Sequence, residues 1–233
     1  MYSINKDNLR YADLVRNKRI IFVGPSDYLK GKGLGKFIDS FDLVIYSNNM
    51  INLLDEKVFL DYGSRCDILY VNVQFERDCF AVWNEKAWLQ KGLKFVCRKM
   101  GTNIPNTIIK NILQRRFLNY TPATDAIEYP GVLMGVSLVA DLVQYPIKSL
   151  YITGIDGYDG APKFYKVGNY SEYVKGYLPK NIQEYRDTKL KGQKCIHACS
   201  RDNNIILDLV KHDTRCTLDP DCLVLLTKAG NKK

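Results

Sequence analysis

The sequence predicts an α/β fold, with a Rossmann-like, mostly parallel sheet that carries helices on both faces. Short apolar runs rich in β-branched residues recur along the chain, and such runs are typical of buried strands. Segments with the apolar spacing of helices lie between most of these runs. Strands that are joined by helices rather than tight turns run parallel and are covered on both faces.

The N-terminal third contains one predicted helix and three predicted strands. Apolar residues at helical spacing indicate a short helix over residues 7–17. The run Ile-Ile-Phe-Val predicts a strand at residues 20–23, and Leu-Val-Ile-Tyr predicts the next at 43–46. A third apolar run, at residues 67–72, ends in a polar residue.

The middle of the chain alternates in the same way. Helical patterns cover residues 81–91 and 106–117, with a fourth strand predicted at 93–97. Residues 131–144 are apolar nearly all round, which predicts a helix packed under the sheet. A proline then ends this helix, and a fifth strand is expected at residues 149–154.

The last third differs in composition. Residues 157–194 are polar, rich in tyrosine and weakly periodic, so we expect a long loop or lid within a single domain that spans residues 1–233. An amphipathic pattern predicts a helix at residues 202–211, and the apolar run at 222–227 predicts a last strand.

Charge and cysteine content narrow the classes of protein. A net charge of +9 favours anionic ligands such as nucleotide phosphates, acidic sugars, nucleic acid or anionic membrane surfaces. Seven irregularly spaced cysteines indicate reduced core residues. No apolar stretch approaches the ~20 residues of a membrane span, and the first residues lack the apolar core of a signal peptide. We therefore expect a cytoplasmic protein, with a lumenal domain of a longer chain as the alternative.

A glycine-rich stretch follows the first predicted strand. Gly31, Gly33 and Gly35 occupy alternate positions. Glycine lets backbone N–H groups approach an anion closely, and such turns in α/β sheets bind phosphates. The wider pattern of the stretch is Gly24-x-Ser26-x-x-Leu29-Lys30-Gly31-x-Gly33-x-Gly35-x-x-Ile38-Asp39-Ser40-x-Asp42-x-Val44-x-x-x-Asn48.

This pattern resembles the large sialylmotif of eukaryotic sialyltransferases, and Gly63-Ser64-Arg65 resembles the end of that motif. The resemblance implies a GT-A-like variant of the Rossmann-like fold that binds a nucleotide sugar. Gly24, Ser26 and Asn48 would line the nucleotide site. Asn72, which ends the third predicted strand, is expected at the same edge of the sheet.

Residues 131–158 resemble the small sialylmotif and, more closely, the matching segment of bacterial sialyltransferases. The N–H groups of a helix that starts at Gly131 would face an anion. Asp156, just past a strand, could accept hydrogen bonds from ribose hydroxyls or a base. The alternative is that this segment is ordinary core and that Asp156 caps a turn.

The segment from His197 to Asp202 resembles the very small sialylmotif, whose histidine is the general base. A neutral imidazole near pH 7 can take the proton of an acceptor hydroxyl. Asp202 would orient the ring, or serve as the N-terminal residue of a helix. The only other histidine, His212, is interpreted as a surface residue at a helix C-terminus.

The leaving phosphate needs fixed donors as negative charge grows on it. In bacterial relatives two tyrosines after the Gly-Ile-Asp element supply them without a metal. Tyr158 matches the first tyrosine. Phe164 occupies the position expected for the second, and Tyr165 lies one residue further on. Packing of a lid is the alternative role for both. Asp219-Pro220-Asp221 resembles a metal-binding Asp-x-Asp but is interpreted as a turn.

Some positions depart from the family pattern. The asparagine next to Gly24 is replaced by Pro25 (or by Val23, depending on the alignment), the arginine before Asn48 by Tyr46, and the Ser/Thr pair before the small motif by Tyr129 and Pro130. These departures fall on donor recognition. The resemblance thus implies an inverting sialyltransferase-like enzyme that uses CMP-sialic acid, needs no cofactor or metal, and acts on a glycan acceptor.

Two alternatives remain from the sequence. The same fold could use or hydrolyse another nucleotide sugar. A non-catalytic protein that binds nucleotides or nucleic acid is the other, although no zinc spacing, basic helix or RNA-binding aromatic signature supports nucleic acid.

Overall fold

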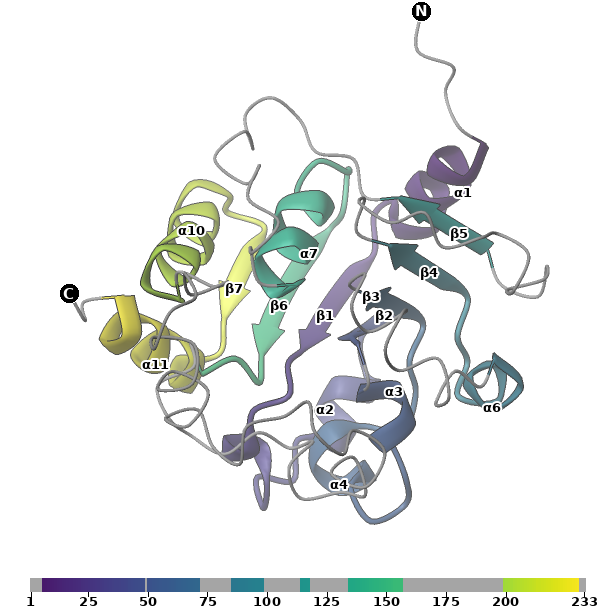
Figure 1. Cartoon of the computed structure of the whole chain (residues 1–233), viewed down its shortest axis with the longest axis horizontal. Coiled ribbons are helices and arrows are strands. Elements are labelled where there is room, and N and C mark those ends of the chain that lie inside the picture. The colour runs from purple at the N-terminus through teal and green to yellow at the C-terminus, as the bar shows by residue number, and fades with distance from the viewer. Residues whose placement is uncertain are drawn as a thin grey trace, which may run out of the picture.

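A computed structural model describes residues 6–48, 50–71, 85–98, 114–117, 134–156 and 199–230. Within these residues, seven strands form one sheet in the order β5-β4-β3-β2-β1-β6-β7 (Figure 1). All the neighbouring pairs are parallel. The strands are β1 (Arg19–Val23), β2 (Leu43–Ser47), β3 (Ile68–Val71), β4 (Phe95–Arg98), β5 (Gln114–Phe117), β6 (Ser149–Thr153) and β7 (Cys216–Leu218).

The order of the strands reverses at β1. From β1 the chain adds β2, β3, β4 and β5 on one side, and then returns to place β6 and β7 on the other. The connections that follow β1 and β6 therefore lead away from each other, one toward β2 and the other toward β7. In open α/β sheets, this reversal opens a crevice at the carboxyl ends of the two strands, where ligands bind.

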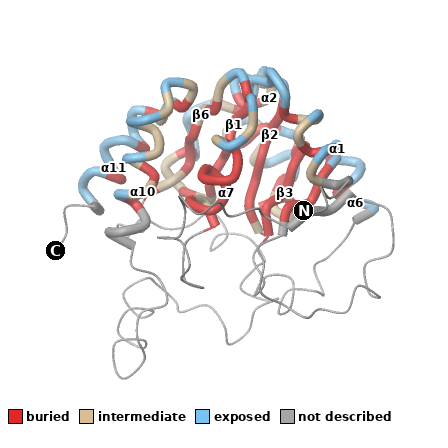
Figure 2. Tube along the Cα trace, turned by 90° about the horizontal axis from the view of Figure 1, so that it is seen from above, coloured by how far each residue is buried: buried red, intermediate tan, exposed pale blue. Residues whose placement is uncertain are grey.

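Helices cover both faces of the sheet, as Figure 2 shows. One face packs against α1 (Lys6–Val15) and α7 (Met134–Leu142). The other packs against the 3-10 helix η1 (Asp27–Leu29) and the helices α2 (Gly35–Asp39), α3 (Met50–Leu53), α4 (Phe59–Tyr62) and α6 (Glu85–Gln90). A third apolar cluster joins α7 to α10 (Cys199–His212) and α11 (Pro220–Gly230).

The alternation of β1 side chains explains this layering. Ile20 and Phe22 enter the cluster beside α1 and α7, whereas Ile21 and Val23 enter the cluster beside η1 to α6. Successive side chains of a strand point to opposite faces, so a strand that is apolar at every position must be covered twice. The predicted parallel sheet with helices on both faces is confirmed.

Two predicted elements are wrong. The apolar run at residues 222–227 belongs to helix α11 and not to a strand. Cys222 and Leu226, one helical turn apart, are fully buried, whereas Leu223 and Val224 are about half exposed (49% and 51%). Residues 114–117, predicted to end a helix, form strand β5. The three-residue strand β7 was not predicted.

Other predicted elements are confirmed within the described residues. The helix packed under the sheet is α7, in which all nine residues except Gly135 are buried. The remaining part of the predicted helix at 106–117 and the predicted lid at 157–194 lie outside the described residues. Among the helices that the structure describes, none has the length and apolar character to cross a membrane.

Candidate functional site

The carboxyl ends of β1 and β6 remain joined beyond the strands themselves. The N–H of Gly24 donates to the carbonyl of Thr153 at 2.8 Å, and the N–H of Ser26 donates to the carbonyl of Gly154 at 2.9 Å. These bonds continue the parallel ladder between the two strands. The loops that follow β1 and β6 therefore start side by side at the point where the strand order reverses.

Glycine is required on both sides of this junction. Gly154 has a φ of +74°, in the left-handed region that L side chains disfavour. A Cβ atom on Gly24 would lie 2.3 Å from the carbonyl oxygen of Gly154, and one on Gly154 would lie 2.4 Å from that of Gly24. The backbones approach more closely than any side chain permits.

Ser26 and Asp156 meet just beyond the two glycines. The Ser26 hydroxyl donates to the Asp156 carboxylate at 3.1 Å, and both residues are at most 1% exposed. The Ser26 carbonyl in turn accepts the hydroxyl of Tyr62 at 2.9 Å. Three predicted site residues, Gly24, Ser26 and Asp156, are thus brought together at the switch point of the sheet.

Asn48 follows β2, the neighbour of β1 on the other side. It has a left-handed φ of +52°, and its N–H donates to the carbonyl of Tyr70 at 2.7 Å. Parallel strands end at the same edge of a sheet, so Asn48 shares the edge of Ser26 and Asp156. The predicted site residues outside the described residues are Asn72, Gly131, Tyr158, Tyr165 and His197; Asp202 lies in α10, and its side chain is not described.

The glycine-rich loop binds a carboxylate of the same chain, that of Asp61. The N–H groups of Gly31 and Gly33 each donate to a carboxylate oxygen of Asp61, at 2.8 Å. Gly35 allows α2 to pack against α4, because a Cβ there would lie 1.8 Å from the carbonyl oxygen of Phe59. The expectation that this turn presents its N–H groups to a phosphate is therefore corrected, since Asp61 occupies them.

Further motif residues hold loops together. The N–H and hydroxyl of Ser64 donate to the Asp39 carboxylate, at 3.0 and 2.8 Å. Arg65 pairs with the buried carboxylate of Asp67 at 2.6 Å, and that carboxylate also accepts the N–H of Val44 at 2.8 Å. Structural hydrogen bonds thus account for the end of the large-motif pattern.

A buried polar cluster lies behind the end of β6. The hydroxyl of Tyr28 accepts the N–H of Gly154 at 2.7 Å and lies 3.2 Å from both the Thr153 hydroxyl and the Cys222 thiol. The Thr153 hydroxyl donates to Asp219 at 2.9 Å. Sequence inspection missed this cluster, and its one visible signal was a threonine inside an apolar strand.

Burial keeps the Cys222 thiol and the Tyr28 phenol of this cluster protonated. It raises the pKa of Cys222 to about 12 and also raises the pKa of Tyr28, because desolvation disfavours both anions. At neutral pH the thiol and the phenol are therefore neutral hydrogen-bonding groups rather than nucleophiles. Cys66, Cys97, Cys216 and Cys222 are buried free thiols, as expected for core cysteines.

Asp219 begins a helix rather than forming a turn. Its carboxylate accepts the N–H groups of Asp221 at 2.7 Å and Cys222 at 3.3 Å, which caps α11. The carboxylate of Asp221 pairs with Lys32 from the glycine-rich loop. In the part of the chain that the structure describes, no group of three or more His, Cys, Asp or Glu side chains is placed to hold a metal ion.

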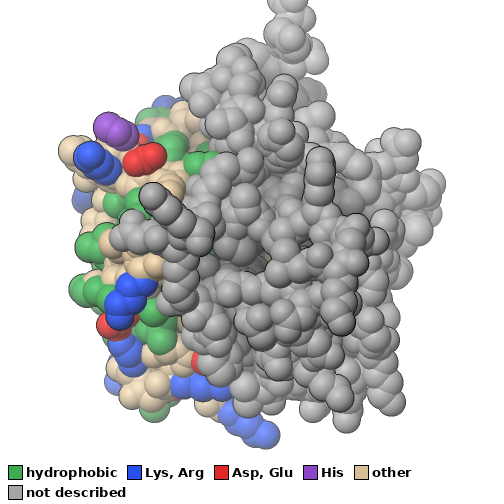
Figure 3. Space-filling view, turned by 60° about the vertical axis from the view of Figure 1, so that its left-hand side comes forward, with side chains coloured by type: hydrophobic (Ala, Val, Ile, Leu, Met, Phe, Trp, Pro, Cys, Tyr) green, Lys and Arg blue, Asp and Glu red, His purple; other side chains and the backbone are tan. Residues whose placement is uncertain are grey.

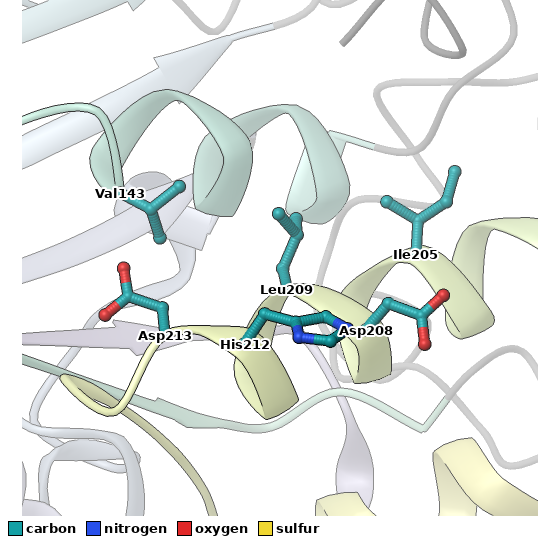
Figure 4. Close-up of a pocket in the computed structure, with 6 residues that line it drawn as sticks. All are labelled: Val143, Ile205, Asp208, Leu209, His212 and Asp213. Carbon is teal, nitrogen blue, oxygen red and sulfur yellow. The ribbon is translucent and has the colours of Figure 1, made fainter. Parts of the chain in front are cut away.

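A pocket of about 280 Å³ lies between α7 and α10, at the opposite edge of the sheet (Figure 4). His212 and Asp208 from α10 line it, together with Val143, which follows α7. The pocket lies near the amino ends of the strands, because α10 ends at His212 just before β7 begins. His212 is exposed, as predicted for a surface residue at a helix C-terminus. The face in Figure 3 carries a histidine side chain on its surface, beside basic and acidic side chains.

No family model and no curated protein matches the chain. Solved structures do. A tyrosine-to-phenylalanine variant of the sialyltransferase CST-II in complex with CMP matches with a TM-score of 0.56 at 14% identity, over 86% of this chain and 80% of that one. CST-II with a trisaccharide acceptor and CMP matches with a TM-score of 0.50 at 13% identity, over 85% of this chain and 79% of that one.

A mammalian sialyltransferase in complex with Gal-beta-1-3GalNAc-ortho-nitrophenol matches with a TM-score of 0.51 at 14% identity, over 94% of this chain and 81% of the other. At such low identity the likeness concerns the fold. The chain therefore has a fold like that of these sialyltransferases.

Proposed function

We propose that the chain is a sialyltransferase-like enzyme that moves sialic acid from CMP-sialic acid to a hydroxyl of a glycan acceptor. The observation that carries this proposal is the pairing of Ser26 with Asp156 at the switch point. Ligands of open α/β sheets bind there, and the fold is like that of CST-II, which has been seen with CMP.

In this proposal, the loops after β1 and β6 hold the nucleotide. Asp156 accepts hydrogen bonds from the ribose or the base, while Gly24 and Ser26 lie beside the phosphate, with Asn48 and Asn72 from the neighbouring strand ends. Because Ser26 and Asp156 are at most 1% exposed, a nucleotide that uses their side chains must displace the atoms that now cover them. Binding is therefore expected to be coupled to a local opening.

The chemistry assigned to the remaining residues follows the resemblance to the sialylmotifs. His197, with Asp202 beside it, takes the proton of the acceptor hydroxyl as its oxygen attacks the anomeric carbon. The bond to CMP breaks as the new bond forms on the opposite face, so the configuration inverts. Tyr158 and Tyr165 donate to the leaving phosphate, and Gly131 directs helix N–H groups at an anion. No metal is needed in this scheme.

One residue supports a nucleotide-sugar donor other than CMP-sialic acid. Tyr46, which replaces an arginine of the family pattern, is fully buried in the sheet and donates to the carbonyl of Tyr62. Tyr46 therefore supplies none of the positive charge that the arginine of the family pattern would offer to a donor phosphate. Transfer or hydrolysis of a different nucleotide sugar is therefore the second candidate function.

A nucleotide panel separates the two candidates. CMP at about 100 times its dissociation constant stabilises the fold by about 2.7 kcal/mol and raises the melting temperature. We expect this rise with CMP and CMP-sialic acid, and none with UDP or GDP at the same concentrations. A rise with UDP or GDP alone would support the second donor. No rise with any nucleotide would contradict both.

The two histidines provide a matched test of the base. His197→Ala should lower the turnover of CMP-sialic acid by about two to four orders of magnitude. His212→Ala, at the opposite edge of the sheet, should leave turnover unchanged. Normal turnover in His197→Ala would rule out its role as the base.

A further inference from the structure

The hydrogen bonds around the end of β6 converge on the two residues that precede Asp156. The N–H of Gly154 donates to the Tyr28 hydroxyl at 2.7 Å. The N–H of Ile155 donates to the Cys222 sulfur at 3.3 Å, and the thiol donates back to the carbonyl of Ile155 at 3.1 Å. Side chains from two distant segments thus hold consecutive peptide groups.

The two segments differ in what they connect. Tyr28 lies in η1, two residues after Ser26, so one loop contacts both Gly154 and Asp156. Cys222 lies in the first turn of α11, which the carboxylate of Asp219 caps. The position of Asp156 is therefore tied to the β1 loop on one side and to a capped helix on the other.

The protons in the cluster can be assigned. The Thr153 hydroxyl gives its proton to Asp219, so it can only accept from the Tyr28 hydroxyl. The phenol accepts the N–H of Gly154 and has one proton left for either Thr153 or the Cys222 sulfur. The bonds that the phenol and the thiol donate need both groups protonated, and burial favours these forms at neutral pH.

We propose that Tyr28 and Cys222 are positioning residues that hold the Gly154–Ile155 peptides and thereby place Asp156 for the nucleotide. This inference rests on the proposed function, because it concerns the same site. Neither residue touches the nucleotide in this account. Each holds the backbone next to Asp156 and so keeps the Asp156 carboxylate within hydrogen-bonding distance of Ser26.

The test uses the full chain and two readouts. Amide hydrogen exchange at residues 154 and 155 reports on the hydrogen bonds to Tyr28 and Cys222, and calorimetric titration with CMP reports on the nucleotide site. In Tyr28→Phe and in Cys222→Ala, exchange at these amides should become about tenfold faster or more, and the dissociation constant for CMP should rise about tenfold. Cys222→Ser keeps a donor and an acceptor at this position and should restore both values toward those of the wild type.

The control is Tyr11→Phe. The Tyr11 hydroxyl is buried and bonds the hydroxyl of Tyr70 at 2.5 Å, on the face of the sheet that packs against α1. This variant should lose a similar amount of stability but keep the wild-type exchange at residues 154 and 155 and the wild-type affinity for CMP. A residue with a merely structural role would behave like this control.

The outcomes separate the two proposals. Unchanged exchange at residues 154 and 155 in both Tyr28→Phe and Cys222→Ala would overturn the claim that these two side chains hold the peptides. Faster exchange with unchanged affinity for CMP would overturn the positioning role alone. A wild-type chain that binds no CMP would overturn the proposed function, and the positioning role with it, whatever the exchange rates.

Discussion

One methyl group added at Gly154 tests the close approach of the two strand ends. In Gly154→Ala, the new Cβ atom would lie 2.4 Å from the carbonyl oxygen and 2.8 Å from the nitrogen of Gly24, and both are backbone atoms. Neither can rotate away as the end of a side chain would. The β1 and β6 ends must therefore separate, or the turn must change its conformation.

The expected cost has two parts. An alanine held at a φ of +74° costs about 1–2 kcal/mol relative to glycine. Forcing a methyl group into a filled space costs about 1–3 kcal/mol more. The total of about 2–5 kcal/mol is a large share of the roughly 5–15 kcal/mol that stabilises a typical domain.

Comparison with Gly92→Ala isolates the cost of the steric contact. Gly92 has a similar φ of +84°, but a Cβ atom there would meet nothing within 4 Å. Urea unfolding of both variants should therefore give Gly154→Ala a free energy of unfolding about 1–3 kcal/mol lower than that of Gly92→Ala. Equal free energies of unfolding for the two variants would refute the close contact between Gly24 and Gly154.

Two further predictions concern groups outside this contact. Asp61→Asn should lower the free energy of unfolding by about 1 kcal/mol, because a charged acceptor for the N–H groups of Gly31 and Gly33 is lost. Asp55→Asn is the control, because within the described residues the Asp55 carboxylate accepts one hydrogen bond, from the N–H of Lys57, and an equal loss in both variants would contradict this reasoning. Burial raises the pKa of Cys222 from 9.0 to about 12, so its thiol adds stability that is fully present below pH 9 and is lost as the pH rises toward 12. Urea midpoints should fall across this window, less steeply in Cys222→Ser than in the wild type, and equal slopes would be inconsistent with a buried thiol.

The sheet was predictable because buried parallel strands are apolar at every position. Strand β1, with Ile20, Ile21, Phe22 and Val23, follows this rule. The rule failed for α11, where the exposed Leu223 and Val224 fill the gaps in a helical pattern and produce a continuous apolar run. The sequence Asp219-Pro220, with a helix-capping residue followed by proline at the first helical position, was the signal that favoured a helix.

Part of the site was predictable from motifs and part was not. Ser26 and Asp156 belong to separate recognisable patterns, and topology alone places both at one edge of the sheet. The contact between Tyr28 and Cys222 joins residues 194 positions apart, and nothing local in the sequence indicates it. Likewise, the sequence does not reveal which carboxylate folds back onto Gly31 and Gly33.

We propose that the carboxyl ends of β1 and β6 hold a pyrimidine nucleotide, and the decisive experiment is hydrogen exchange with and without saturating CMP. We expect CMP to slow exchange at residues 24–26 and 154–156, and Asp156→Ala to abolish this protection while the sheet stays folded. Protection confined to residues 205–213, beside the pocket between α7 and α10, or no protection anywhere in the chain, would contradict it.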